Sequence, residues 1–209
     1  MRCLALTRCS AAGMGVALLA LLAGCGGLRS DVRPDRIYVL QVAQPAAAPA
    51  TTAVPGMLVV QRPTVQPGLE TDRIALTRAG NELDFYAASR WGGSLPAVLG
   101  AFAVQSLAGS FTTVSGAERG AGAGDFELLI TARHFEAEYA AGGVPVARVA
   151  LECLLVAAAP RRVLGSCDAD VREPAADNRM GEIVMAFERA AQRALQEMRA
   201  KAVAAAARR

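Results

Sequence analysis

Histidine is scarce in this 209-residue sequence, which contains only His134. A zinc site needs three or four ligands, and no cluster of cysteine and histidine accompanies this residue. The sequence also lacks a Gly-x-Ser-x-Gly motif, and the glycine-rich residues 116–124 lack the Gly-Lys-Ser/Thr of a P-loop. We therefore interpret His134 as a half-buried strand residue and expect no catalytic residue, no metal site and no enzyme activity.

The sequence also lacks a large excess of charge of either sign. The chain has 22 Lys and Arg against 19 Asp and Glu, a formal net charge of +3. A protein that binds nucleic acid by its phosphates usually carries a basic patch or stripe, and none is evident here. We expect no nucleic-acid partner.

The sequence has no apolar run long enough to cross a bilayer as a helix. The longest, at about residues 11–23, is shorter than the ~20 residues that a span requires. It follows Arg2 and Arg8 and ends in Leu22-Ala23-Gly24-Cys25, which is the anatomy of a secretory signal with a lipobox. The alternative is an ordinary secreted protein with a cysteine there by chance.

The lipobox predicts how the N-terminus is processed. Residues 1–24 are a signal peptide that is removed, Cys25 carries the covalent lipid, and residues 25–35 form a tether. This lipid anchors the protein to a membrane, and we expect no other cofactor. Gly26-Gly27-Leu28 has no aspartate at the second mature position. By resemblance to proteobacterial lipoproteins, in which an aspartate there often means retention in the inner membrane, this implies the outer membrane with the protein facing the periplasm.

Two cysteines remain in the folded part. Cys3 and Cys9 leave with the signal, Cys25 is acylated, and Cys153 and Cys167 are left in an oxidising compartment. They are equidistant from Pro160 in a predicted hairpin, where they would face each other closely enough for a disulfide. The alternative is two buried free thiols that pack as small apolar side chains.

The order of predicted elements indicates the fold class. A helix begins after Ser94 with Pro96 in its first turn, and a last helix is capped by Asp177 or Asn178. Residues 45–55 are an Ala/Pro-rich loop. We predict a single α+β domain over residues 36–205, a mostly antiparallel sheet with two helices packed on one face. Strands are expected at residues 36–42, 57–65, 73–77, 82–89, 111–114, 125–139, 144–156 and 162–171.

Residues 125–139 alternate well between apolar and polar side chains. Strict alternation places Phe126, Ala132 and His134 on one face of the strand and Phe135 on the other.

Several blocks resemble the ABC-type transport auxiliary lipoproteins, the PqiC-like family. The most specific block runs from Arg62-Pro63-Thr64 through residues 73–76 to Arg90-Trp91. Further similar blocks are residues 37–40, 125–128, 135–137 and 186–190, so the resemblance covers most of the mature chain. The Ala/Pro-rich loop and the pair Cys153 and Cys167 depart from the family pattern.

The resemblance implies a role without catalysis. Such proteins are accessory parts of MCE-type systems, in which an inner-membrane ABC permease, its ATPase and a periplasmic MCE-domain protein move lipids between membranes. The lipoprotein would dock or stabilise the periplasmic assembly at the outer membrane, contribute to envelope integrity, and form a homo-oligomer around the assembly.

Within the most similar block we select candidate partner-interface residues. These are Asp72, Arg73, Tyr86, Arg90 and Trp91, because aromatic and guanidinium groups are enriched at interface hot spots. The alternative is structural: Trp91 and Phe85 seat the hairpin on the first helix, and Asp84 pairs with an arginine.

Other functions compete with this one. A pilotin-like or other outer-membrane assembly lipoprotein would have a similar shape. A periplasmic hydrolase would need a pocket that joins His134 to a serine or carboxylate. Direct lipid carriage would need an open apolar groove lined by Leu99, Phe102 and Phe187.

Overall fold

The strand β7 (Phe126–Glu138) is the centre of the sheet in the computed structural model, which describes residues 34–42, 53–78, 82–119, 124–140 and 143–208. On one side β7 pairs antiparallel with β8 (Val146–Ala157), and β8 pairs antiparallel with β9 (Arg162–Pro174). This confirms the predicted meander. Cys25 and most of the Ala/Pro-rich loop lie outside the described residues.

The other side of β7 is lined by three strands that follow one another along the chain. They are β2 (Val54–Val60), β3 (Thr64–Val65) and β4 (Arg73–Arg78), and each pairs parallel with a successive part of β7. Pro63, which has no N–H to donate, lies in the break between β2 and β3. Because β2 begins at Val54, the last two residues of the predicted loop belong to a strand.

The remaining strands complete a mixed sheet. β5 (Glu82–Trp91) forms the expected antiparallel hairpin with β4, whereas β1 (Arg36–Tyr38) runs parallel to β5, and β6 (Phe111–Gly116) runs parallel to β2. The prediction of a mostly antiparallel sheet was therefore wrong in part. Hairpins between neighbours can be read from a sequence, whereas long-range parallel partners leave no local signal.

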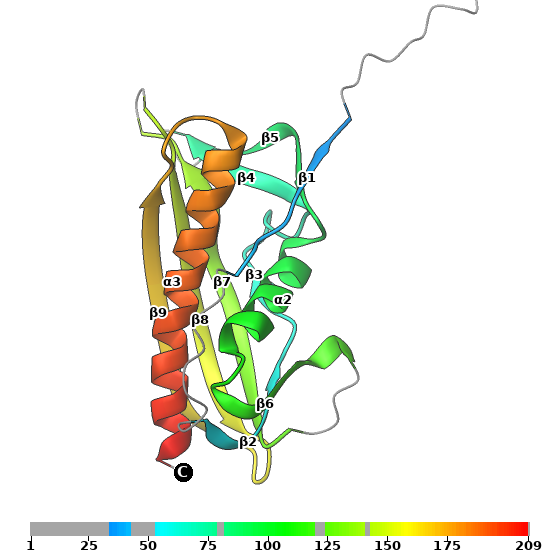
Figure 1. Ribbon diagram of the computed structural model, residues 1–209, viewed down its shortest axis with the longest axis vertical. Coiled ribbons are helices and arrows are strands. Elements are labelled where there is room, and N and C mark those ends of the chain that lie inside the picture. The colour runs from blue at the N-terminus through cyan, green and yellow to red at the C-terminus, as the bar shows by residue number, and fades with distance from the viewer. Residues whose placement is uncertain (1–33, 43–52, 79–81, 120–123, 141–142, 209) are drawn as a thin grey trace, which may run out of the picture. The chain divides into compact units, whose positions relative to one another are not determined.

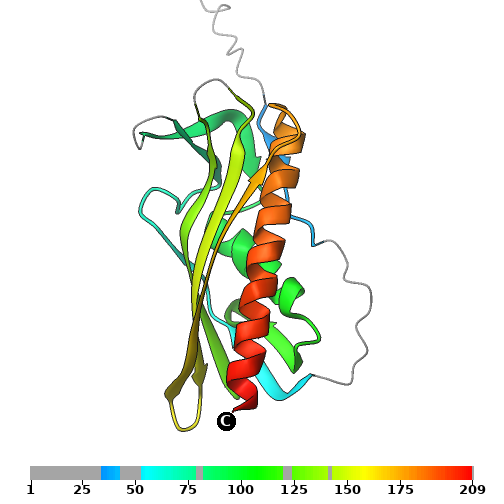
Figure 2. The ribbon, with the colours of Figure 1, turned by 90° about the vertical axis from the view of Figure 1, so that its left-hand side faces the viewer.

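Both described α-helices cover the same face of the sheet, which confirms that part of the fold class (Figures 1 and 2). α2 (Leu95–Leu107) begins after Ser94, and α3 (Met180–Ala207) packs along β8 and β9. The Asp177 carboxylate accepts the backbone N–H of Arg179, so it acts at the start of α3 although Arg179 occupies the cap position. A short 3₁₀ helix, η3 (Ala117–Arg119), follows β6.

Three aromatic side chains link β5, β7 and α3 in the core. The rings of Phe135 and Phe187 stack with centroids 5.1 Å apart, and the Trp91 indole meets both rings edge-on. Such pairs add stability beyond the burial of their area. Asp35 onward forms one compact unit around this core.

Candidate functional site

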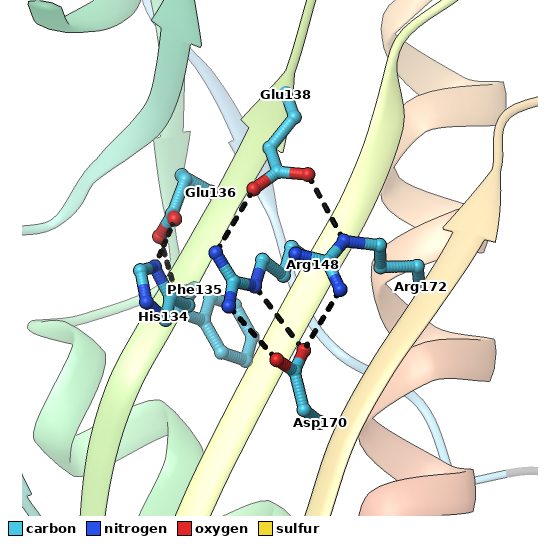
Figure 3. Close-up of polar contacts among 7 residues, drawn as sticks. All are labelled: His134, Phe135, Glu136, Glu138, Arg148, Asp170 and Arg172. Carbon is cyan, nitrogen blue, oxygen red and sulfur yellow. Dashed lines mark hydrogen bonds and ion pairs between the residues drawn. The ribbon is translucent and has the colours of Figure 1, made fainter. Parts of the chain in front are cut away.

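The sheet face turned away from the helices carries a cluster of alternating charges (Figure 3). Arg148 of β8 donates two hydrogen bonds to Asp170 of β9, at 3.1 and 2.8 Å, and one of 3.2 Å to Glu138 of β7. Arg172 reaches the other Glu138 oxygen at 3.2 Å and lies 3.7 Å from Asp170. We call Glu138, Arg148, Asp170 and Arg172 the charge cluster.

The register explains this arrangement. Arg148 lies directly opposite Arg172 across β8 and β9, where two like charges would repel. Each acid occupies a diagonal position between the two guanidinium groups and so offsets that repulsion. Hydrogen bonding to Asp170 raises the pKa of Arg148, and the same bonds lower the pKa of Asp170. Both shifts favour the charged forms of Arg148 and Asp170.

A β-bulge decides which residues share this face. The pairing of β7 with β8 shifts register between Ala132 and His134. As a result Ala132 and Phe135 are both buried on the helix side, and His134 turns to the open face. The strict alternation that placed Ala132 and His134 on one face was wrong, because the extra residue Arg133 reverses the parity.

His134 forms a pair with Glu136 beside the charge cluster. Its Nδ1 lies 2.6 Å from one carboxylate oxygen, and the other oxygen accepts the Phe135 N–H at 2.6 Å. The Glu136 side chain is 6% exposed and that of His134 is 34% exposed, which agrees with the interpretation of a half-buried strand histidine.

A hollow of about 610 Å³ lies above this pair. Its lining includes His134, Glu136, Arg78 and Tyr139, and among the described lining residues there is no serine or cysteine nucleophile. His134 therefore meets a carboxylate, as the hydrolase alternative requires, and that carboxylate also accepts the backbone N–H of Phe135.

The predicted interface residues are engaged within the domain. Arg90 forms a salt bridge with Asp35 and another of 2.7 Å with Asp72, which fixes the start of the compact unit to β5. The Arg73 guanidinium lies 4.2 Å from the centroid of the Phe85 ring. Ala88 of β5 has a positive φ of 50°, which is unusual for a residue with a side chain.

Tyr86 is partly buried and Trp91 is buried. The Tyr86 hydroxyl donates to Tyr139, which donates to Asn178, and burial raises the Tyr86 pKa. Trp91 is only 2% exposed. The structure places Trp91 in the core, so its assignment to a partner surface was wrong. The structural alternative is confirmed in that Trp91 is a core residue, and its ring packs on Phe135 of β7 and Phe187 of α3.

Cys153 and Cys167 are directly opposite in the β8–β9 register and form a disulfide, with Cα atoms 5.0 Å apart. Both are nearly buried on the helix side of the sheet. The bond ties together the hairpin that carries part of the charge cluster.

The residues proposed to line a lipid groove are part of the core. Leu99, Phe102 and Phe187 are each at most 2% exposed and pack with the other buried residues, so they line no open groove. Among the described residues, no helix is long and apolar enough to span a membrane. The same residues contain no group of three or more candidate metal ligands.

Sequence reasoning missed the charge cluster. Asp168, Asp170 and Arg172 alternate along β9 with buried Cys167, Ala169 and Val171, which was a visible signal of a charged open face. The diagonal pairing with Glu138 depends on the bulge and could not be read from the sequence.

The arrangement of a mixed sheet and two helices has known counterparts. A family model described as "ABC-type transport auxiliary lipoprotein component" matches residues 38–199. The chain belongs to this family. The resemblance found in the sequence is thereby confirmed, and the protein is an auxiliary lipoprotein of ABC-type transport.

Solved structures agree with the fold of this auxiliary lipoprotein. Protein XCC0632 from Xanthomonas campestris is 23% identical and matches with a TM-score of 0.74, covering 83% of this chain and 97% of that chain. An uncharacterised protein is 14% identical with a TM-score of 0.63, covering 80% and 98%. No functionally curated protein matches the chain.

Proposed function

We propose that this auxiliary lipoprotein serves an MCE-type lipid transport system. Cys25 holds it in the outer membrane, facing the periplasm, and its folded unit docks the MCE-domain protein and through it the ABC permease and ATPase. The observation that carries this proposal is the family match over residues 38–199, which spans the folded unit that follows the lipobox. The protein acts by binding, without catalysis, metal or cofactor other than its lipid.

The open face of β7, β8 and β9 is the surface that we propose for docking. Its charged side chains are held in place by one another, so little conformational entropy is lost when a partner binds. Arginine is enriched at interfaces, and non-obligate interfaces are about as polar as the rest of a surface. An exposed apolar residue, Leu154, lies on the same strand as Arg148. Docked copies would form a homo-oligomer around the MCE protein.

Affinity purification of the lipoprotein from membranes tests the partner. The MCE-domain protein should co-purify with the wild-type chain and be lost with Leu154→Asp, which places a charge where it is exposed. Val39→Asp is a matched control, since Val39 is an exposed apolar residue of another surface. Recovery of secretin components in place of the MCE protein would overturn the proposal in favour of a pilotin-like role.

The anchor has its own test. A Cys25→Ala chain should fold normally, because Cys25 precedes the compact unit that begins at Asp35. It should leave the membrane fraction and fail to restore envelope integrity in a deletion strain. Full complementation by this variant would contradict the proposed role of the anchor.

A further inference from the structure

We propose that the end of the domain at which β1 begins rests on the lipid surface that holds the anchor, with Ile37, Leu83, Val144 and Met185 in contact with the bilayer. This inference rests on the proposed lipidation of Cys25. The folded unit itself would thus make a second contact with the membrane, in addition to the one made by the acyl chains.

Exposed apolar side chains gather at this end. Seven large apolar residues among those described are 38% to 61% exposed. Four of them, Ile37, Leu83, Val144 and Met185, come from four segments distant in sequence: the start of β1, the start of β5, the approach to β8 and the first turns of α3. Figures 1 and 2 both place these segments at the same end of the sheet, opposite the hairpin turn between β8 and β9.

The chain that leads to the anchor enters at the same end. Nine residues, 26–34, separate Cys25 from Asp35, and ten peptide steps span at most about 36 Å. The lipidated cysteine therefore keeps Asp35 within that distance of the bilayer surface. This reach is comparable to the length of α3, which at 28 residues is about 42 Å. For the opposite end of the domain to contact the bilayer, the tether would have to run along most of the length of the molecule.

The entry point is fixed to the fold. Arg90 of β5 bridges Asp35 and Asp72, and the Gly92 N–H donates to the Tyr38 carbonyl at 2.8 Å. The tether is therefore attached at a fixed point of the folded unit, at the end where β1 begins. This geometry brings a lipid surface close to the apolar end of the domain. Contact between apolar side chains and the interface of a bilayer is favourable.

Site-specific fluorescence in vesicles tests the contact. In the mature lipoprotein Cys25 is acylated and Cys153 is bonded to Cys167, so an added cysteine is the one free thiol. We would label Ile37→Cys and, separately, Leu83→Cys with an environment-sensitive dye. The matched control is Val163→Cys: Val163 is 60% exposed, against 61% for Ile37, and is the second residue of β9, at the opposite end.

The labelled lipoproteins would be reconstituted in phosphatidylethanolamine and phosphatidylglycerol vesicles that contain a nitroxide-labelled phosphatidylcholine. We expect a blue shift and loss of emission at positions 37 and 83 and neither at position 163. Equal quenching at 37 and 163, or none at 37 and 83 in protein that floats with the vesicles, would overturn the inference and leave the proposed function intact. A blue shift at 37 that depends on protein concentration and not on nitroxide lipid would assign the surface to a second copy and overturn it as well. Protein that does not float has no lipid anchor, and both proposals then fail.

Discussion

The Trp91 indole stands edge-on to the Phe187 ring, with centroids 5.5 Å apart and planes at 88°. This contact fastens the end of β5 to α3, two elements about a hundred residues apart in sequence. Trp91→Ala should therefore lower the free energy of unfolding by about 3–5 kcal/mol, the usual cost of emptying a large aromatic site. Urea denaturation followed by circular dichroism measures it.

A control for this prediction keeps an aromatic ring in place. Trp91→Phe should cost distinctly less, because part of the contact with Phe135 and Phe187 remains. A Trp91→Ala protein with an unchanged denaturation midpoint would show that Trp91 is not a core residue.

Acid should weaken the charge cluster. Hydrogen bonding to Arg148 lowers the pKa of Asp170 below its ordinary value of 3.8, so the pair stabilises the fold above that value. The contribution is lost as the pH falls through the lowered pKa. Asp170→Asn should cost no more than about 1 kcal/mol at pH 7, because the pair is partly exposed and screened. Thermal melts of both proteins should converge once the pH falls below that lowered pKa, and a difference that persists there would have another origin.

Glu188 gives the opposite dependence on pH. Burial raises the pKa of this carboxyl above its ordinary value of 4.5, although the Gln41 N–H donates to it at 2.9 Å. The ionised form is thus penalised in the fold at neutral pH. Glu188→Gln keeps an acceptor for the Gln41 N–H. It should raise the free energy of unfolding at pH 7 by about 0.5 kcal/mol, which is a typical size for a substitution at a protein surface. The gain should disappear below pH 4, where both states of the wild type are protonated. Equal gains at pH 7 and pH 4 would contradict this account.

The disulfide should stabilise the β8–β9 hairpin. It closes a loop with a sequence separation of 14, for which loop-closure entropy gives about 3 kcal/mol. Reduction by dithiothreitol, or the pair Cys153→Ala and Cys167→Ala, should lower the melting temperature, as differential scanning calorimetry would show. The double variant is its own control, since added dithiothreitol should not change it further. A wild type that melts identically with and without reductant would contradict the prediction.

Local patterns predicted most elements of this fold. Pro96 in the first turn and apolar residues such as Leu99 and Phe102 mark α2, and the turn before Glu82 marks the β4–β5 hairpin. The parallel partners of β7 could not be predicted, because the pairs Leu58 with Phe126 and Leu76 with Ala137 join segments more than sixty residues apart. No turn or spacing signals such a pair.

The candidate site was less accessible to sequence reasoning. Arg90 and Trp91 have the composition of an interface, yet one ties down Asp35 and the other fills the core. Composition alone cannot distinguish a side chain that is free to contact another protein from one whose contacts are all made within its own domain. The charge cluster was missed because one residue, Arg133, shifts the register and brings Glu136 and Glu138 to the open face.

The path of β2, β3 and β4 along one side of β7 has a consequence for how the protein acquires its structure. A chain made from its N-terminus produces these three strands before the strand on which they align. The β7–β8–β9 meander with α3 relies on nearby residues and can form quickly once synthesised, whereas the parallel pairs need closure of long loops and form slowly. Apolar residues of the N-terminal half, such as Leu58 and Ile74, are therefore uncovered until β7 is in place, and we expect the chain to be most prone to aggregation during this interval.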